Sequence, residues 1–298
     1  YYDSNTIIYL NGSFVKAADA SIDLYSQSLH YGYSVFERIR SYKTASGVTK
    51  IFKPKEHYDR FEQSALAINM PYEWETSELI RITDELLEKN KLGDAYIRPL
   101  VYAPANMTFN VNNQSYLVIQ AWEMAPFLGE KLLRVHTSSF QRPNPHAFHM
   151  RAKAAGHYVN SIIASQEAKA KGYDEALLLD MNGNVAEAPG ANIFIEKDGV
   201  LYTPPAGYIL PGITRATVIE LAAKLGIPCV EKHFSVEDIY QADAAFYCGT
   251  AVEVIGFESL DNRSLQKNWF DTLSRQIQLA YKNLVVEAPI QSPEKQFA

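Results

Sequence analysis

The sequence predicts an α+β fold made of two domains, a smaller one over residues 1–124 and a larger one over residues 125–298. Three observations support this prediction. The chain has 298 residues, and a domain usually contains roughly 100–200 residues. Hydrophobic residues make up 47% of the chain and charged residues 21%, as in ordinary globular proteins. The first third of the chain reads as strands, then helices, then strands, which is typical of α+β folds.

The smaller domain is predicted to begin with a β-hairpin. Thr6–Leu10 reads as a strand, Asn11-Gly12 is a strong two-residue turn signal, and Phe14-Val15 returns from the turn. We expect a domain boundary near Ala125-Pro126. Between the hairpin and this boundary we expect three strands, at 34–42, 95–102 and 115–122. We also expect two helices, one that begins at Pro54 and one that spans 77–90.

The expected strand at 34–42 carries several charged residues. Because side chains alternate along a strand, Phe36, Arg38 and Arg40 are predicted to share one face. Glu37 is predicted to point to the opposite face. We expect the face with Arg38 to look into the functional site.

The larger domain is predicted to mix strands and helices. Two pairs, Asn182-Gly183 and Asp198-Gly199, indicate tight turns between successive strands in the range 175–202. The other expected elements are strands at 132–137 and 244–248, a Pro-rich loop at 142–145, and helices at 158–171, 214–225 and roughly 267–286.

Composition excludes several classes of function. Lys and Arg number 28 against 34 Asp and Glu, for a formal charge of -6, so we expect no nucleic-acid surface. Cys229 and Cys248 are isolated, which predicts neither a disulfide framework nor a metal site. No apolar run reaches the roughly 18 residues that a membrane helix needs, and we expect a cytoplasmic protein.

Four short segments could bind a ligand. Lys153 lies among small residues that leave room around its amine, and Glu187 is a second candidate. Leu210–Arg215 is a tight turn that leads into a helix, and Gly249–Ala251 could form an anion-binding nest. Taken singly, each segment is more typical of a solvated side chain or an ordinary turn or helix cap than of a ligand site.

The order of these segments is more specific than any one of them. Together with three earlier segments, the series resembles the class IV (fold type IV) aminotransferases, whose fold is that of D-amino acid aminotransferase, and is most similar to their branched-chain members. The likeness spans about residues 5–285. The segments are Leu29–Gly32, Val35–Glu37, the helix with His57 and Arg60, Lys153–Tyr158, Glu187–Asn192, Leu210–Arg215 and Gly249–Ala251.

The resemblance implies pyridoxal phosphate at the domain interface, and it assigns a role to each matching residue. Lys153 would form a Schiff base with the cofactor and then move the proton at the substrate Cα. Glu187 would pair with the pyridine nitrogen, and Tyr158 with the ring hydroxyl. The phosphate ligands would be Arg60, the amides of Ile213 and Thr214, and Thr250.

The same resemblance implies a substrate site and a function. The amides of Thr250 and Ala251 would bind the substrate α-carboxylate. Tyr31, Phe36 and Tyr96 would line an apolar pocket, and Arg98 would bind the distal carboxylate of glutamate or 2-oxoglutarate. The implied reaction is transamination between branched-chain or related L-amino acids and 2-oxoglutarate, without a metal, in a homodimer or higher homo-oligomer.

Three departures from the family pattern affect the substrate. Arg38 stands where most branched-chain members have glycine, and Ala191 stands where a glutamate is common. Both changes make the pocket more positive, so we expect acidic or polar substrates to be favoured more than in typical members. The loop from Pro104 to Asn113, which in the family reaches the partner subunit's pocket, lacks the usual Gly-rich form.

Other functions fit parts of the same pattern. Within the family they are a D-amino acid aminotransferase, an R-amine transaminase or an aminodeoxychorismate lyase. Outside it, a non-catalytic protein that binds a phosphate ligand would need only the helix start and the nest. His30-Tyr31-Gly32, Tyr96 and Arg98 favour the branched-chain hypothesis.

Overall fold

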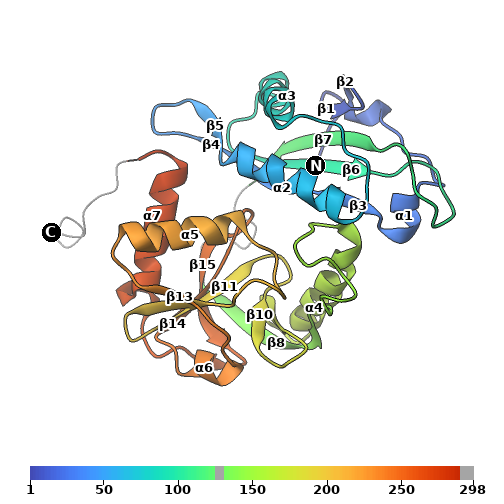
Figure 1. Ribbon diagram of the computed structural model, residues 1–298. Coiled ribbons are helices and arrows are strands. Elements are labelled where there is room, and N and C mark those ends of the chain that lie inside the picture. The colour runs from blue at the N-terminus through green and yellow to red at the C-terminus, as the bar shows by residue number, and fades with distance from the viewer. Residues whose placement is uncertain (125–130, 289–298) are drawn as a thin grey trace.

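The computed structural model describes residues 1–124 and 131–288, which form two β-sheets with helices packed against them (Figure 1). The boundary predicted near Ala125-Pro126 lies outside the described residues. The mixture of helices and strands confirms the predicted α+β class.

The first sheet has seven strands in the order β2-β1-β7-β6-β4-β5, with β3 paired to β6. The predicted hairpin is confirmed: β1 and β2 pair across Asn11 and Gly12, whose φ angles of 45° and 92° suit such a turn. The strands are β1 (Ile7–Leu10), β2 (Ser13–Lys16), β3 (Ser34–Phe36), β4 (Ile39–Lys43), β5 (Thr49–Ile51), β6 (Ala95–Tyr102) and β7 (Tyr116–Glu123).

Three helices belong to this half: α1 (Gln27–Tyr31), α2 (Pro54–Ala67) and α3 (Thr76–Lys89). Pro54 begins α2 because a first-turn residue needs no N–H donor. The apolar faces of α2 and α3 pack together on the sheet. Their buried residues include Tyr58, Phe61, Ala65, Leu79, Ile82 and Leu86.

The prediction of one strand over 34–42 is wrong. β3 ends at Phe36 and β4 begins at Ile39, so Glu37 and Arg38 form a break between them. The N–H of Glu37 donates to the carbonyl of Pro99 in β6. Pro99 has no N–H to donate in return, so the ladder of hydrogen bonds cannot continue regularly at this point.

The second sheet has nine strands in the order β10-β9-β8-β15-β14-β11-β12-β13, with β16 paired to β15. The turns at Asn182-Gly183 and Asp198-Gly199 are confirmed by the pairings of β9 with β10 and of β11 with β12. The strands are β8 (Leu133–Gln141), β9 (Glu175–Leu179), β10 (Val185–Glu187), β11 (Asn192–Lys197), β12 (Val200–Thr203), β13 (Cys229–Glu231), β14 (Ala244–Gly249), β15 (Glu253–Leu260) and β16 (Arg263–Ser264).

Side chains of this sheet alternate between two cores. Phe194 and Phe246 pack with α5 (Ile213–Lys224) and α7 (Leu273–Val285), whereas Ile195 and Tyr247 belong to the core on the other face. Figure 1 shows α5 and α7 side by side on the sheet, and α4 (Tyr158–Ala170) below the first sheet. The short helix α6 spans Val236–Tyr240.

The helix predicted over 267–286 begins later than expected. A 3-10 turn, η3, occupies Trp269–Asp271, and α7 begins at Leu273. The side chain of Thr272 accepts a hydrogen bond from the N–H of Arg275 and caps the new helix. The other predicted helices match within a residue: 77–90 is α3, 158–171 is α4 and 214–225 is α5.

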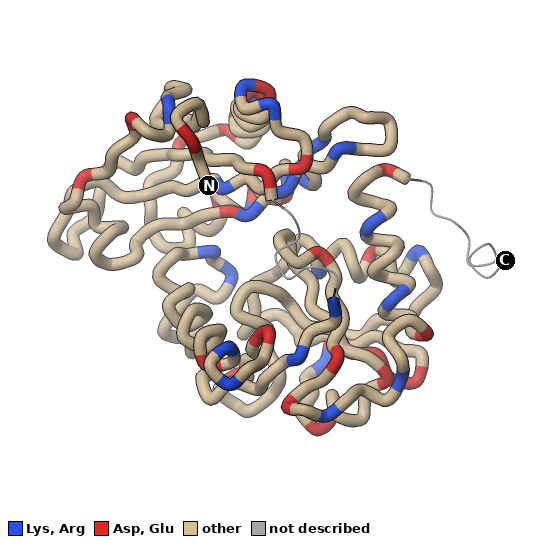
Figure 2. The backbone as a smooth tube through the Cα atoms, turned by 180° about the vertical axis from the view of Figure 1, so that it is seen from behind, with Lys and Arg blue, Asp and Glu red and all other residues tan. Residues whose placement is uncertain are grey.

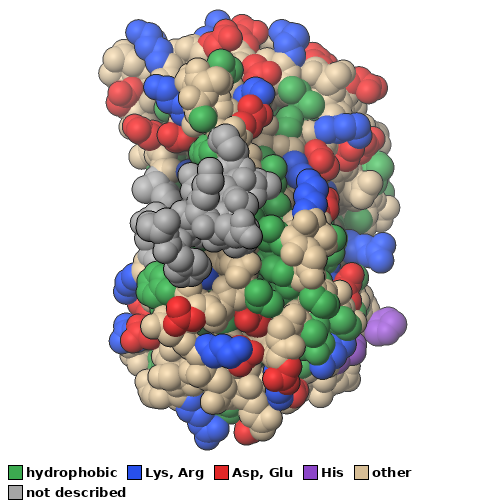
Figure 3. Space-filling view, turned by 90° about the vertical axis from the view of Figure 1, so that its left-hand side faces the viewer, with side chains coloured by type: hydrophobic (Ala, Val, Ile, Leu, Met, Phe, Trp, Pro, Cys, Tyr) green, Lys and Arg blue, Asp and Glu red, His purple; other side chains and the backbone are tan. Residues whose placement is uncertain are grey.

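Charges of both signs are spread over the surface. Figure 2 shows Lys and Arg interleaved with Asp and Glu along both halves of the backbone, and Figure 3 shows both signs intermixed on one face. No helix in the described residues is long and apolar enough to cross a membrane. These residues also contain no group of three or more His, Cys, Asp or Glu arranged to bind a metal.

Candidate active site

Lys153 lies where the two halves of the molecule meet. Its backbone N–H donates to the Ser64 hydroxyl of α2 at 3.0 Å, and its carbonyl accepts from the N–H of Phe36 at 3.1 Å. The neighbouring Gly156 lies so close to Gly32 that a Cβ on Gly32 would come within 2.8 Å of the Gly156 Cα. The backbone of the Lys153 segment is therefore attached to the first sheet and to α1.

The Lys153 amine is buried and is held between two aromatic side chains. Its Nζ lies 2.8 Å from the Tyr158 hydroxyl and 5.2 Å from the centre of the Phe36 ring. Burial lowers the pKa of Lys153; the Tyr158 hydroxyl opposes this effect, and the charges of Arg38 and Arg60 add to it. Such an amine is more readily neutral, and so nucleophilic, than a solvated lysine.

Tyr158, the first residue of α4, carries the hydroxyl that Lys153 contacts. Burial alone would raise its pKa, but the charges of Lys153 and Arg38 outweigh burial and lower it. Its ring packs edge-on against Phe36, with 4.8 Å between the ring centres. The phenol is thus a fixed hydrogen-bonding group beside the amine.

Glu187 ends β10 and is buried at the opposite side of the same cavity. Its carboxylate lies 3.0 Å from the Arg142 Nε, and it accepts hydrogen bonds from the Asn192 side chain at 3.0 Å and from the Leu210 N–H at 3.3 Å. Burial raises the pKa of Glu187, while the charge of Arg142 opposes this rise. The carboxylate is held in one orientation by donors on three segments.

The start of α5 lines the cavity with unpaired amide groups. Gly212 is the N-cap, and the N–H groups of the first turn, including those of Ile213 and Thr214, have no partner within the helix. A Cβ at Gly212 would lie 2.0 Å from the Asn192 side-chain oxygen, so the turn requires glycine. Thr250, between β14 and β15, also lines this cavity.

Arg60 brings a positive charge to the helix start. It donates from Nη1 to the Pro211 carbonyl at 3.1 Å, immediately before the first turn of α5. Helix starts and guanidinium groups both attract anions, and phosphate in particular. The arrangement is an anion site of two independent parts.

Glu37 holds Arg60 in place. The carboxylate accepts from the Arg60 Nε at 2.7 Å and from its Nη2 at 2.8 Å, and it lies 2.9 Å from the His57 Nδ1. Burial favours a raised pKa for Glu37, but the charge of Arg60 and the hydrogen bond with His57 outweigh it, so the pKa is lowered. Glu37 is thus an ionised residue inside the protein.

A second cavity of about 300 Å³ opens beside the first. The two cavities share Arg38, Tyr158, Ser161 and residues 188–191. The second cavity is also lined by Tyr96, Arg98, Trp122, Glu175, Ala251 and Val252. A ligand that reacts at Lys153 could therefore extend its side chain past Arg38 into this space.

Most of the residues predicted from the sequence meet around these two cavities. Three of them do not line either cavity in the described residues. Phe36 lies behind the lining, with its ring against Tyr158 and Lys153, and the other two lie elsewhere. Arg40 pairs with Glu253 at 3.3 Å and donates to the Met124 carbonyl, and it is not among the described residues that line either cavity. Tyr31 is 44% exposed on α1, where its ring lies 5.3 Å from that of Phe109.

Three functional contacts were missed in the sequence. Arg142 contacts Glu187 from the loop after β8, Asn192 bridges Glu187 and the Leu210 carbonyl, and Glu37 organises Arg60. The Asn192 contact follows from the β10–β11 hairpin, in which Glu187 and Asn192 are direct partners. The other two join segments distant in the sequence, for which no local signal exists.

A buried lysine beside a tyrosine, a buried carboxylate and a helix-start anion site lie where an antiparallel sheet and a mixed sheet meet, an arrangement that fits an aminotransferase of class IV. The family model described as amino-transferase class IV matches residues 34–260. The chain belongs to this family.

Individual relatives carry a more specific name. The chain is 39% identical to the branched-chain-amino-acid aminotransferase of Pseudomonas aeruginosa over 95% of its own length and 94% of that protein. Its structure is similar to that of the branched-chain aminotransferase of Thermoproteus uzoniensis with norvaline (TM-score 0.91, 36% identity, 95% of each chain). It is also similar to the branched-chain amino acid aminotransferase of Thermobaculum terrenum in its PLP-form (TM-score 0.90, 34% identity, 96% of each chain).

Proposed function

We propose that this protein catalyses pyridoxal-phosphate-dependent transamination between branched-chain or related L-amino acids and 2-oxoglutarate. The observation that carries the proposal is the buried Lys153 amine, 2.8 Å from the Tyr158 hydroxyl, in one cavity with Glu187 and the start of α5. The names of the relatives support the substrate class, because the likeness covers 95% of the chain.

The donor set of the first cavity fits pyridoxal phosphate. Arg60, the amides of Ile213 and Thr214, and Thr250 would hold the phosphate. Tyr158 would donate to the ring oxygen, and Glu187 would keep the ring nitrogen protonated. The residues therefore match a ligand with an anion at one end and a basic nitrogen near the other.

When bound, pyridoxal phosphate supplies an electron sink for the electrons of a broken bond at the substrate Cα. Lys153 would then take up the proton at Nζ and return it. Its burial and its lowered pKa favour the neutral amine that this transfer needs. Tyr158, hydrogen-bonded to Nζ, would keep the amine oriented between transfers.

The substrate would lie across the opening between the two cavities. We propose that the amides of Thr250 and Ala251 bind its α-carboxylate, since these residues line the first and second cavities respectively. The side chain would enter the second cavity, with Phe36 beside Lys153 and Tyr96 in the wall. Arg98 would meet a distal carboxylate.

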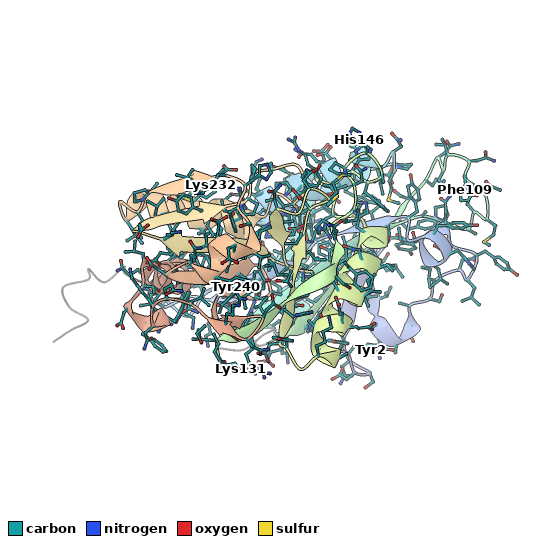
Figure 4. The ribbon with its side chains drawn as sticks, turned by 90° about the horizontal axis from the view of Figure 1, so that it is seen from below. Tyr2, Phe109, Lys131, His146, Lys232 and Tyr240 are labelled. Atoms are coloured by element: carbon teal, nitrogen blue, oxygen red, sulfur yellow. The ribbon has the colours of Figure 1, made fainter. Side chains whose placement is uncertain are left out.

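We also propose a homodimer in which exposed apolar residues of α1, of the segment just before it and of the β6–β7 loop form part of the interface. Figure 4 shows Phe109 projecting at one end of the molecule. Phe109 is 87% exposed, an unusual state for so large an apolar side chain. The patch comprises Leu24, Tyr25, Leu29, Tyr31, Met107, Phe109 and Val111.

The proposal further includes two domains, each built on one sheet, with the cofactor between them, and a cytoplasmic location. Arg40 and Glu253 would join the domains, because they come from β4 and β15. The free thiols of Cys229 and Cys248 suit a reducing compartment.

Borohydride reduction of the loaded enzyme tests the role of Lys153. The reduction should fix the cofactor to the peptide that contains Lys153. Lys153→Met should abolish this labelling and lower kcat with L-leucine and 2-oxoglutarate by roughly 10³-fold. Labelling of another lysine, or an active Lys153→Met enzyme, would refute the assignment.

Lys169→Met is the matched control, because Lys169 is exposed on α4. This variant should retain the labelling of Lys153 and the wild-type kcat. A substrate panel of L-leucine, D-alanine, an R-amine and aminodeoxychorismate separates the related functions. Activity with D-alanine alone would replace the branched-chain proposal.

A further inference from the structure

Two arginines face each other in the second cavity. Arg38, from the break between β3 and β4, and Arg98, from β6, both place their guanidinium groups near the Phe36 ring. The Cζ of Arg98 lies 4.7 Å from the ring centre and that of Arg38 lies 5.8 Å from it. Two positive charges thus converge on one aromatic side chain at the opening toward Lys153.

Neither guanidinium is in direct contact with a carboxylate in the described residues, although the charges of Glu37 and Glu175 act on Arg38 from a distance. Within the described residues, the Nε atoms of both arginines are buried without a hydrogen-bond partner, and neither arginine forms an ion pair. Arg98 makes one side-chain bond, from Nη2 to the Tyr96 hydroxyl at 3.0 Å. A buried guanidinium N–H without an acceptor is costly, so the two Nε groups make the site suited to an anionic ligand.

The acidic residue of the cavity wall does not supply this anion. Glu175 lines the cavity and is buried, but its Oε1 accepts from the N–H of Ala176. Burial raises the pKa of Glu175, which favours its neutral form. Neither arginine has an ion-pair partner in the described residues, so a ligand carboxylate could contact both guanidinium groups directly.

The surroundings hold Arg38 at this position. Its Cζ lies 5.3 Å from the centre of the Tyr158 ring, and its Nη1 packs against Gly190, where a Cβ would come within 2.9 Å of it. Its backbone N–H donates to the Glu37 carboxylate at 3.1 Å. Arg38 is therefore fixed by an aromatic face, by a glycine and by the network that also holds Arg60.

We propose that Arg38 is a specificity-determining residue that acts with Arg98 to bind the second carboxylate of a dicarboxylic substrate, so that acidic amino acids are preferred to aliphatic ones. The inference rests on the proposed function, because that carboxylate belongs to an amino acid bound at Lys153. An acidic substrate satisfies both guanidinium groups through charge-assisted hydrogen bonds. An aliphatic substrate leaves the buried Nε groups of both arginines unpaired, which a site of this kind disfavours.

The test compares L-glutamate with L-leucine as amino donors for the loaded wild-type enzyme and for Arg38→Gln. We expect wild-type kcat/KM to be at least about tenfold higher for glutamate, and the glutamate-to-leucine ratio to fall at least about tenfold in Arg38→Gln. Arg38→Lys, which keeps the charge but loses the planar fork, should give an intermediate ratio. An unchanged ratio in Arg38→Gln would overturn the proposal.

Binding of two unreactive acids provides a readout without turnover. Calorimetry should show that glutarate, a dicarboxylate, binds about tenfold more weakly to Arg38→Gln than to wild type. The affinity for 4-methylvalerate, a monocarboxylate of similar length, should fall much less. Equal losses for the two acids would show that Arg38 acts on the whole site and not on the second carboxylate.

Arg81→Gln is the matched control, because Arg81 is an exposed residue of α3, and it should leave the ratio and both affinities unchanged. Failure of the proposed function would be recognised separately, as an enzyme that transaminates neither donor. The glutarate titration would still report whether Arg38 binds a dicarboxylate in that case.

Discussion

The two cavities that meet at Arg38 differ in how their buried charges are compensated. In the first cavity, Glu187 faces Arg142, and the Arg60 side chain is bonded to Glu37. In the second cavity, Arg38 and Arg98 have no acidic partner among the described residues. The first cavity is organised by the protein itself, whereas the second is completed only by a ligand.

This difference corresponds to two chemical tasks. A resident cofactor is always the same molecule, so the side chains around it can be fixed by mutual hydrogen bonds before it binds. Substrates alternate in a transaminase, and a rigidly satisfied pocket would reject all but one of them. Of the seven buried side-chain atoms without a hydrogen-bond partner in the described chain, Arg98 Nε and Trp122 Nε1 belong to the second cavity, Arg142 Nε to the first, and Arg38 Nε to both.

Removing a charge from the first cavity should therefore have the largest effect on stability. Glu37→Gln leaves Arg60 buried with a weaker acceptor, and breaking a buried ion pair costs about 3–5 kcal/mol. We expect the free energy of unfolding to fall by about 3 kcal/mol in urea titrations. Glu85→Gln, in an exposed helical pair with Arg81 and Lys89, is the control and should cost less than about 0.5 kcal/mol.

The loss of stability in Glu37→Gln should depend on pH in a defined direction. The pKa of Glu37 is lower in the folded protein than its ordinary value of 4.5. Its contribution is therefore fully present above that value and is lost as the pH falls through the folded-state pKa. The difference between wild type and Glu37→Gln should shrink in acid, and a difference that stays constant down to unfolding would contradict the ion pair.

The first cavity also shows how far the sequence could be interpreted. The proximity of Lys153 and Tyr158 was predictable, because both belong to one short segment that leads into a helix. The hairpins at Asn11-Gly12 and Asp198-Gly199 were predictable for the same reason, since positive φ angles are a local property of these residue types. The pairing of Arg142 with Glu187 joins residues 45 positions apart, so no local pattern could reveal it.

The second cavity depends on an interruption that no local pattern contains. Residues 34–42 alternate like one strand, but the ladder is interrupted opposite Pro99 of β6, and Arg40 of β4 pairs with Glu253. Arg38 therefore lines the cavities without Arg40. By contrast, α6 was missed although Ser235 and Asp238 form a capping box, a signal that can be read directly from the sequence.

A second prediction tests the uncompensated cavity. Arg38→Met removes a guanidinium whose buried Nε lacks an acceptor, so the free energy of unfolding should rise by about 1 kcal/mol. Arg142→Met is the matched variant in the first cavity and should destabilise the protein, because Glu187 would lose its cation. Urea unfolding of both variants measures the contrast, and a loss of stability in each would mean that Arg38 is compensated in the unliganded protein.

The smallest expected effect concerns His157, which lines the first cavity and packs edge-on against Phe148 at 4.8 Å between ring centres. Burial, reinforced by the charges of Arg142 and His149, lowers its pKa from 6.5 to about 4. The unfolded chain therefore binds a proton first, so this residue costs no stability above pH 6.5, and stability is lost as the pH falls from 6.5 to about 4. His157→Asn should reduce that loss by up to about 1 kcal/mol, after allowance for solvent screening.

Unfolding midpoints at pH 7.5 and at pH 4.5 measure this effect in both proteins. His146→Asn is the control, because His146 is exposed in the loop after β8 (Figure 4), and its pH profile should match that of wild type. If His157→Asn also follows the wild-type profile, His157 is solvated when protonated. The first cavity would then tolerate an additional positive charge, and the contrast with the second cavity would rest on Glu37 and Glu187 alone.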